Sequence, residues 1–60
     1  MTAAQEQALA AYRQPFDEAG WRVTVGETGD RVEISAYGGP RAFRAAWIDP
    51  EGTIHLYAIG

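Results

Sequence analysis

Ser35 and His55 are the only serine and the only histidine of the chain, so they decide whether it could act as a serine hydrolase. That chemistry needs a serine, a histidine and a carboxylate within hydrogen-bond reach of one another. In the strand pairing predicted below, His55 lies four residues along its strand from the row that holds Ser35, a separation of about 13 Å. We therefore predict no catalytic triad and interpret His55 as a partly exposed strand residue available to an interface.

Two glycines and two acidic pairs could also carry chemistry, but each fits a structural role better. Gly38-Gly39 is followed by a proline and another strand, whereas a phosphate-binding loop leads into a helix. Asp17/Glu18 fit the start of a helical turn, and Asp49/Glu51 fit a loop between strands. One helix on a small sheet also offers no deep pocket for paired carboxylates. We therefore expect no enzyme and no catalytic residues.

Length and composition limit what can stabilise the fold. Sixty residues make a single domain, 1–60, whose core rarely supplies more than about 3–5 kcal/mol. The chain has no cysteine and one histidine, which excludes disulfides, thiolate metal sites and a histidine cluster within one chain. No metal and no cofactor are expected. Association remains as a source of stability, and we expect a homodimer.

The sequence predicts no membrane contact. The longest apolar runs span only a few residues, which is too short for a transmembrane helix. The first ten residues lack the basic and apolar regions of a signal peptide. Together with the absence of cysteine, these features favour a cytoplasmic location.

A helix is predicted from residue 3 onward, because Thr2 and Gln5 form a capping-box pattern before an alanine-rich run. Pro15 lacks a backbone donor, so the helix is expected to end near Gln14 or to kink there, with a short new turn after it. Gly20 is expected to close the helical region. Apolar side chains at helical spacing form one stripe, which consists of Ala8, Leu9, Tyr12 and Phe16.

Four strand candidates follow, each with alternating side chains between short loops. They span residues 21–26, 31–37, 42–48 and 53–60, and their connections are rich in glycine or proline. Short links between neighbouring strands imply antiparallel hairpins. The sequence thus predicts an α+β fold, with the N-terminal helix packed on one face of a four-stranded antiparallel meander (α-β-β-β-β).

The first two hairpins are assigned two-residue loops, because a slip of one residue would exchange the faces of a strand. A loop at Thr28-Gly29 pairs Val25 with Val32. A loop at Gly38-Gly39 pairs Ile34 with Phe43 and leaves Glu33 opposite Arg44 on the other face. The proline that follows this second loop cannot donate the hairpin hydrogen bond, so the loop is expected to be wider than ideal.

The last hairpin allows two registers. A three-residue loop with Gly52 in a bulge places Trp47 opposite His55, and turn chemistry favours it. A four-residue loop places Trp47 opposite Ile54 and keeps the apolar residues of all strands on one face. We choose the four-residue loop because it agrees with the other two hairpins.

These registers divide the sheet into a face under the helix and a face that one helix cannot also cover. The predicted core residues of the sheet are Trp21, Val23, Val25, Val32, Ile34, Ala36, Phe43, Ala45, Trp47, Ile54, Leu56 and Ala58. The predicted uncovered residues are Arg22, Thr24, Glu33, Ser35, Tyr37, Arg44, Ala46, Ile48, His55, Tyr57 and Ile59. The last strand carries no charge, so its backbone edge is expected to attract a partner.

Tyrosine and arginine are common at binding hot spots, and the uncovered face carries both. We therefore predict a small non-enzymatic protein-interaction module, an accessory regulator or inhibitor, that binds through this face and through the C-terminal edge strand. The protein partner is not identified by any residue. The predicted partner-binding residues are Tyr37, Arg44, Ile48, His55, Tyr57 and Ile59.

A nucleic-acid-binding module is the alternative, in which aromatic and basic side chains of the sheet contact bases and phosphates. Its residues would be Arg22, Arg31, Arg44 and Tyr57. The formal net charge of −3 argues against it, because such proteins normally carry a basic patch. Salt separates the two functions, since nucleic-acid binding weakens steeply with salt and an apolar dimer does not.

Overall fold

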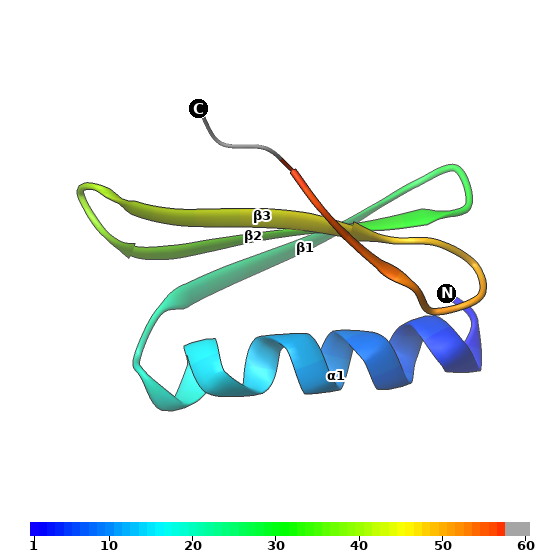
Figure 1. The fold of residues 1–60 in the computed structure, drawn as a ribbon, viewed down its shortest axis with the longest axis horizontal. Helices are drawn as coiled ribbons and strands as arrows, with labels where there is room; N and C mark the ends of the chain where they lie inside the picture. The colour runs from blue at the N-terminus through cyan, green and yellow to red at the C-terminus, as the bar shows by residue number, and fades with distance from the viewer. Residues whose placement is uncertain (58–60) are drawn as a thin grey trace.

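One helix is followed by four strands in the computed structural model, which describes residues 1–57 of the 60. The helix α1 spans Ala3–Glu18, and the strands are β1 (Arg22–Thr28), β2 (Arg31–Gly39), β3 (Ala42–Ile48) and β4 (Ile54–Leu56). The strands form one antiparallel sheet in the order β1-β2-β3-β4, and α1 runs along one side of it (Figure 1). The predicted α+β meander is therefore confirmed.

Both ends of α1 are closed as the sequence predicts. Thr2 Oγ1 accepts a hydrogen bond from Gln5 N at 3.0 Å, and Gln5 Oε1 accepts one from Thr2 N at 2.8 Å, which completes the capping box. At the other end Trp21 N donates to Phe16 O at 2.9 Å across Gly20, the longer bond of a Schellman motif. The Trp21 and Phe16 rings pack with centroids 5.1 Å apart, so the chain enters β1 in a defined direction.

Pro15 does not end the helix, because α1 continues through it to its last residue, Glu18. Proline removes one backbone donor, so the carbonyl of Ala11 loses its helical partner. Ala11 and Pro15 are both exposed, and water can satisfy that carbonyl. No helix in residues 1–57 has the length and the apolar character that crossing a membrane requires.

The first hairpin turns one residue later than predicted. Its loop is Gly29-Asp30, so Thr28 pairs with Arg31 and Val25 pairs with Ile34. Gly29 has φ +61° and Asp30 does not have positive φ, which fits a type II′ turn with glycine first. The predicted loop would have placed the β-branched Thr28 at that position. The register moves by two residues, so the same side chains of β1 still face the helix.

The second hairpin departs furthest from the prediction. Its loop is Pro40-Arg41, so the proline occupies a turn position where no backbone donor is needed. One extra residue, Gly38, forms a bulge in β2 beside this loop. Ile34 therefore pairs with Ala46 rather than with Phe43. Since this register differs from the predicted one by an odd number of residues, every side chain of β3 exchanges face.

Gly38 is a position that only glycine fits, because Trp21 lies against it. A Cβ built on Gly38 would overlap the indole ring of Trp21. The same indole packs on Phe16 at the end of α1. The bulge in β2 and the link between α1 and β1 therefore depend on each other.

The last hairpin has the three-residue loop, so the chosen four-residue loop was wrong. Trp47 pairs with His55, and Asp49 N donates to Thr53 O at 3.0 Å. Gly52 takes the bulge position with φ +88°. The preference of glycine for the bulge position therefore predicted this loop correctly. The four-residue loop was chosen because it kept the apolar residues of all strands on one face, but the face assigned to β3 in that prediction was incorrect.

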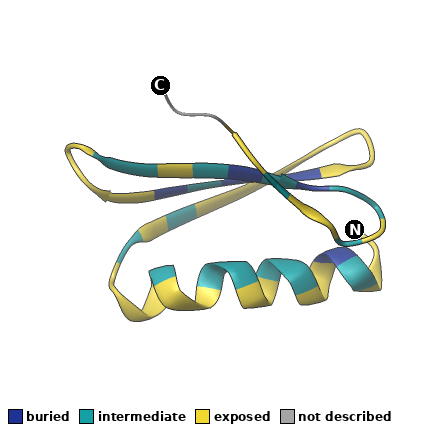
Figure 2. Cartoon of the chain, in the orientation of Figure 1, coloured by how far each residue is buried: buried dark blue, intermediate teal, exposed yellow. Residues whose placement is uncertain are grey.

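The core lies between α1 and the middle of β2 and β3, where Figure 2 shows buried residues on the strands. The buried apolar residues are Val32, Ile34, Ala36, Ala46 and Ile48. Partly buried residues of α1 and β1 pack on this core, namely Ala8, Leu9, Tyr12 and Val23. The predicted contact between the helix stripe and the sheet is therefore confirmed.

Six predicted core residues are placed differently, and one of them is Val25, which keeps the helix side of β1 but exposes 39% of its surface. Phe43, Ala45 and Trp47 lie on the face away from the helix, as a consequence of the bulge at Gly38. Ile54 and Leu56 keep the predicted side of the sheet but expose 36% and 73% of their surface, because α1 packs on β1, β2 and β3. Ala58, a further predicted core residue, lies outside the described residues.

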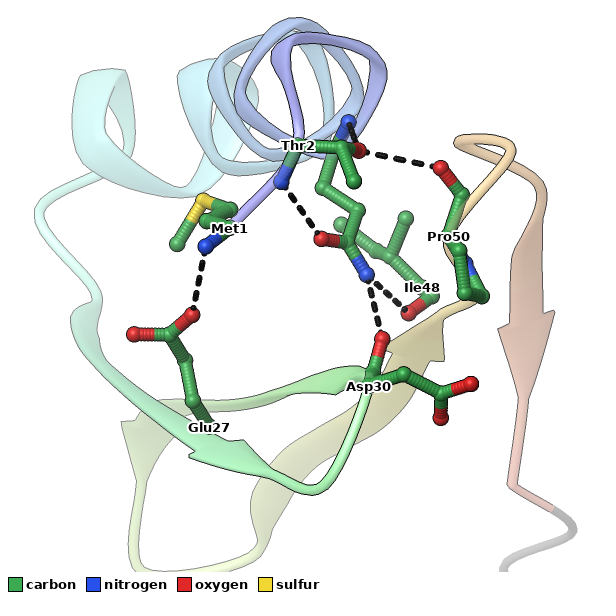
Figure 3. A network of polar contacts seen from close by, with 7 residues as sticks. Met1, Thr2, Glu27, Asp30, Ile48 and Pro50 are labelled. Atoms are coloured by element: carbon green, nitrogen blue, oxygen red, sulfur yellow. Dashed lines mark hydrogen bonds and ion pairs between the residues drawn. The ribbon is translucent and has the colours of Figure 1, made fainter.

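Gln5 is a buried polar side chain that joins three parts of the fold, and Figure 3 labels its bonding partners Thr2, Asp30 and Ile48. Its Nε2 donates to Asp30 O at 2.7 Å in the β1–β2 turn and to Ile48 O at 3.3 Å at the end of β3. Thr2 Oγ1 donates to Pro50 O at 2.9 Å in the β3–β4 loop. An unsatisfied buried polar group costs roughly 1–3 kcal/mol, and the two bonds of Gln5 Nε2 avoid this cost. These bonds and the one from Thr2 Oγ1 hold both turns at this end of the sheet against the start of α1.

Candidate functional site

The sheet has one face that no described element covers, and we call it the open face. It consists of the strand residues that alternate with the core residues, together with Tyr57, whose N donates to Ala45 O at 3.1 Å. Its members are Arg22, Thr24, Gly26, Thr28, Arg31, Glu33, Ser35, Tyr37, Phe43, Ala45, Trp47, His55 and Tyr57. Aromatic and arginine side chains therefore gather on one uncovered surface.

Arg31, Trp47 and His55 form a stack on the open face. Arg31 Cζ lies 3.8 Å from the centroid of the Trp47 ring. The His55 ring stacks on the indole with centroids 4.0 Å apart and 12° between the planes. Arg31 belongs to β2 and His55 to β4, on the two sides of β3, so they hold the indole between them. A cation–π contact of this kind contributes about 0.5–1 kcal/mol at an exposed site.

Asp49 connects this stack to the β3–β4 loop. Its Oδ2 lies 2.9 Å from His55 Nε2, and its Oδ1 accepts from the N–H groups of Glu51 and Thr53, both at 3.0 Å. The hydrogen bond with His55, assisted by the two backbone bonds, lowers the pKa of Asp49 below its ordinary value. Asp49 is therefore charged at neutral pH, and it fixes the orientation of the His55 ring.

Asp49→Asn is expected to reduce the acid sensitivity of the fold. Because the pKa of Asp49 is lower in the folded state than in the unfolded state, its charged form stabilises the fold. This contribution is complete above the ordinary Asp pKa of about 3.9 and is lost as the pH falls through the lowered pKa. Asparagine keeps the oxygen that serves the Glu51 and Thr53 N–H groups but removes the charge that faces His55. Urea midpoints measured between about pH 5 and pH 2 should therefore fall less for the variant than for the natural chain.

Glu51→Gln is the control for this measurement, because it removes a carboxylate from the same loop without contacting His55. Its urea midpoint should follow the pH dependence of the natural chain. Equal slopes for Asp49→Asn and the natural chain would show that the bond between Asp49 and His55 does not stabilise the fold.

A second polar pair crosses the open face beside the stack. Tyr57 Oη donates to Glu33 Oε1 at 2.9 Å. This bond raises the pKa of Tyr57 above its ordinary value, and burial and the Glu33 charge act in the same direction. Tyr57 still exposes 42% of its surface. It presents an ordered aromatic ring whose polar tip already has a partner.

Tyr37 and Phe43 form a second aromatic pair at the other end of the open face, with ring centroids 5.0 Å apart. A depression of about 470 Å³ lies beside them and is lined by Arg22, Thr24, Tyr37 and Gly39. Within residues 1–57 no carboxylate lies within ion-pair distance of Arg22. The depression therefore combines an aromatic ring with an unpaired guanidinium, which suits an acidic group of a partner.

The structure brings together half of the predicted partner-binding residues. Tyr37, His55 and Tyr57 lie on the open face. Ile48 was wrongly assigned to it, because its side chain is 0% exposed in the core. Arg44 was also wrongly assigned, because its partner in β2 is the buried Ala36 on the helix side. Both errors follow from the reversed faces of β3.

Two further facts complete the placement of these residues. On the helix side, burial raises the pKa of Tyr12 while the charge of Arg44 acts in the opposite direction, so the two groups are neighbours. Ile59, which was predicted to bind a partner, lies outside the described residues.

Sequence reasoning missed Trp47 and Phe43 as open-face residues. The signal that could have found them was Pro40, which cannot pair within a strand and therefore belongs in the turn. A turn at Pro40 leaves Gly38 and Gly39 in the strand, and consecutive glycines are common at bulges. The contact of Trp21 with Gly38, which stabilises that bulge, is not visible in the sequence.

The open face offers stacking, cation–π contacts and hydrogen bonds. Two of its titratable groups are bonded to carboxylates, His55 to Asp49 and Tyr57 to Glu33. In the described part of the chain no three His, Asp or Glu side chains lie close enough together to hold a metal ion. The face therefore combines aromatic, cationic and hydrogen-bonding groups on one uncovered surface.

Comparison with known proteins adds no relative to this description. No protein-family model, no curated protein and no solved structure matches the chain. The function is therefore inferred from the residues and their geometry.

Proposed function

We propose that the chain is a small protein-interaction module, an accessory regulator or inhibitor, that docks another protein surface on its open face. The stack of Arg31, Trp47 and His55 is the observation that carries this proposal. Tryptophan, tyrosine and arginine are the residue types most enriched at hot spots of protein interfaces. Because the stack is already ordered, little side-chain entropy is lost when a partner binds.

The edge of β4 offers a second and smaller contact. Along an antiparallel strand, the backbone groups of successive residues point alternately toward the neighbouring strand and away from it. Thr53 O and Tyr57 N bond toward β3, so the backbone groups of Ile54 and Leu56 point outward. Leu56 is 73% exposed. An extended segment of a partner could add to this edge, but a strand of three residues provides few hydrogen bonds. We assign the edge a supporting role.

Nucleic acid fits the open face less well than protein. Both sides of the Trp47 ring are occupied, so this residue cannot stack on a base. Glu33 and Asp49 place carboxylates on the face and at its border, and Arg44 lies on the helix side. The net charge of −3 also opposes phosphate binding.

A photo-crosslinking amino acid at position 37 tests the proposal in the native host. Crosslinks to protein are expected from this open-face position, and none are expected from position 7 on the exposed side of α1. With the crosslinked protein purified, Tyr37→Ser should weaken its affinity at least about tenfold, as hot-spot residues do. Gln7→Ser should leave the affinity unchanged.

Two results would contradict the proposal. One is a partner whose affinity ignores Tyr37→Ser, since the open face would then not be the docking surface. The other is crosslinking to nucleic acid together with strongly salt-dependent oligonucleotide binding. In that case the logarithm of the association constant would fall by several units for each tenfold rise in salt concentration, which would favour the alternative function.

A further inference from the structure

The balance of charged residues differs between the two ends of the sheet. One end, which we call the acidic end, holds the β1–β2 turn and the β3–β4 loop, where Asp30, Asp49 and Glu51 outnumber the one arginine, Arg31. The other end, the basic end, holds the start of β1 and the β2–β3 loop with Arg22 and Arg41. Figure 1 shows these ends at the right and at the left of the molecule.

The charges that matter most for a partner are exposed and unpaired. Asp30, Glu51, Arg22 and Arg41 are all exposed. Among the described residues none of the four takes part in an ion pair, whereas Glu27 is bound to the Met1 amino group at 3.0 Å. An ideal partner for the open face would therefore present acidic groups toward Arg22 and Arg41 and basic groups toward Asp30 and Glu51.

A second copy of the chain meets this requirement in one orientation. Two identical faces can pack around a two-fold axis that lies between them, either along the strands or across them. An axis along the strands would place like ends together, and the charges would repel. An axis across the strands exchanges the ends, so that the basic end of each copy lies over the acidic end of the other.

We propose that the open face binds a second copy of this chain, face to face and with the ends exchanged. This inference rests on the proposed function and names its partner. Arg22 and Arg41 of each copy face the acidic end of the other. The Tyr37–Phe43 pair of each copy meets the stack of Trp47 and its neighbours on the other, so the aromatic groups lose water together.

The area of the open face limits the expected affinity of the dimer. Three strands about 24 Å long and β4, with three residues about 10 Å long, are spaced about 4.8 Å apart and give a face of roughly 400 Å² per copy. The resulting total of about 800 Å² lies below the range of stable complexes and fits a weak, transient contact. We therefore expect a reversible dimer with a dissociation constant in the micromolar range.

Sedimentation equilibrium over a wide concentration range tests this dimer. The natural chain should associate, and the association should weaken several-fold between about 0.05 and 0.5 M salt because the ends contribute ionic contacts. Tyr37→Glu should weaken it at least about tenfold, because it places a charge in the aromatic contact. Leu56→Glu, which alters only the β4 edge, should leave it unchanged.

Paired charge reversals test the ionic contacts between the ends. Arg22→Glu with Arg41→Glu makes both ends acidic, and Asp30→Arg with Glu51→Arg makes both ends basic, so each variant alone should be mainly monomeric. Mixed in equal amounts, the two variants should form a heterodimer at least as strong as the natural dimer, because every contact again joins opposite charges. Circular dichroism of each variant checks that it remains folded.

Several outcomes would overturn the inference, and they differ from those that overturn the proposed function. A natural chain that stays monomeric at about 1 mM, or a dimer that is lost in Leu56→Glu and kept in Tyr37→Glu, excludes this pairing. Failure of the mixed variants to associate excludes ionic contacts between the ends. A natural dimer that strengthens with added salt excludes the exchanged ends, because it means that like ends repel each other. If the chain is monomeric while position 37 crosslinks to another protein, the proposed function stands and its partner is not a second copy.

Discussion

Ile48→Ala is expected to lower the free energy of unfolding by about 2–5 kcal/mol, the cost of deleting a buried isoleucine side chain down to alanine. Ile48 is 0% exposed and belongs to the central cluster with Val32 and Ile34. A core of this size rarely supplies more than about 3–5 kcal/mol, so much of the variant should be unfolded at room temperature. Urea denaturation followed by circular dichroism measures the loss.

Ile54→Ala is the matched control for this prediction. Ile54 is the direct pairing partner of Ile48, is the same residue type and lies on the same side of the sheet, but it is 36% exposed. Ile54→Ala should lower the free energy of unfolding by no more than about 1 kcal/mol. Ile48→Val, which should cost about 0.5–1.5 kcal/mol, keeps the measurement possible if the alanine variant is fully unfolded.

The same substitution separates the two assignments of Ile48. If Ile48 belonged to a partner-binding face, as the sequence alone predicts, alanine would weaken binding and leave stability nearly unchanged. Equal stability of Ile48→Ala and Ile54→Ala would therefore contradict the register of β3 and, with it, the composition of the open face.

Gly38→Ala is expected to have the second largest effect, a loss of about 1–3 kcal/mol from overpacking. The added methyl group would overlap the Trp21 indole, so the indole must leave its position between the bulge and Phe16. The indole N–H signal of Trp21 in an NMR spectrum should shift, and the urea midpoint should fall. Gly26→Ala is the control, because nothing lies within 4 Å of a Cβ at Gly26 and its φ is not positive.

A double-mutant cycle isolates the cause of the Gly38 effect. In a Trp21→Ala background the extra methyl group has nothing to displace, so Gly38→Ala should then cost close to zero. An undiminished cost in that background would mean that the backbone of the bulge, rather than the indole, requires glycine.

The bulge links the stability of this protein to its binding surface. Gly38 sets the face of β3, and the face of β3 decides that Trp47 joins Arg31 and His55 while Ile48 fills the core. A chain that lost the bulge would have to move Trp47 toward the helix or unpair β3. We therefore expect that variants which disturb Trp21 or Gly38 also weaken binding through the open face.

Local patterns were sufficient for the elements and for part of the site. The capping box of Thr2 and Gln5, the stripe that includes Leu9 and Tyr12, and the order of helix and strands all follow from neighbouring residues, and the structure has them. Tyr37 was placed on the correct face because β2 kept its predicted face. His55 and Tyr57 were also placed correctly, because the registers of the β2–β3 and β3–β4 hairpins both differ from the predicted ones by an odd number of residues. Each difference exchanges the faces of the following strand, so in β4 the two exchanges cancel. Agreement at His55 and Tyr57 thus came from compensating errors in the two hairpins.

By itself the sequence determined which segments form the helix and the strands, because capping, turn and alternation signals act over a few residues. Only the tertiary structure decided which side of β3 is buried. That choice depends on one residue, Gly38, and on a contact with Trp21 from another part of the chain. Alternation leaves the two faces of β3 nearly equal in apolar character, so a single long-range contact was enough to decide between them.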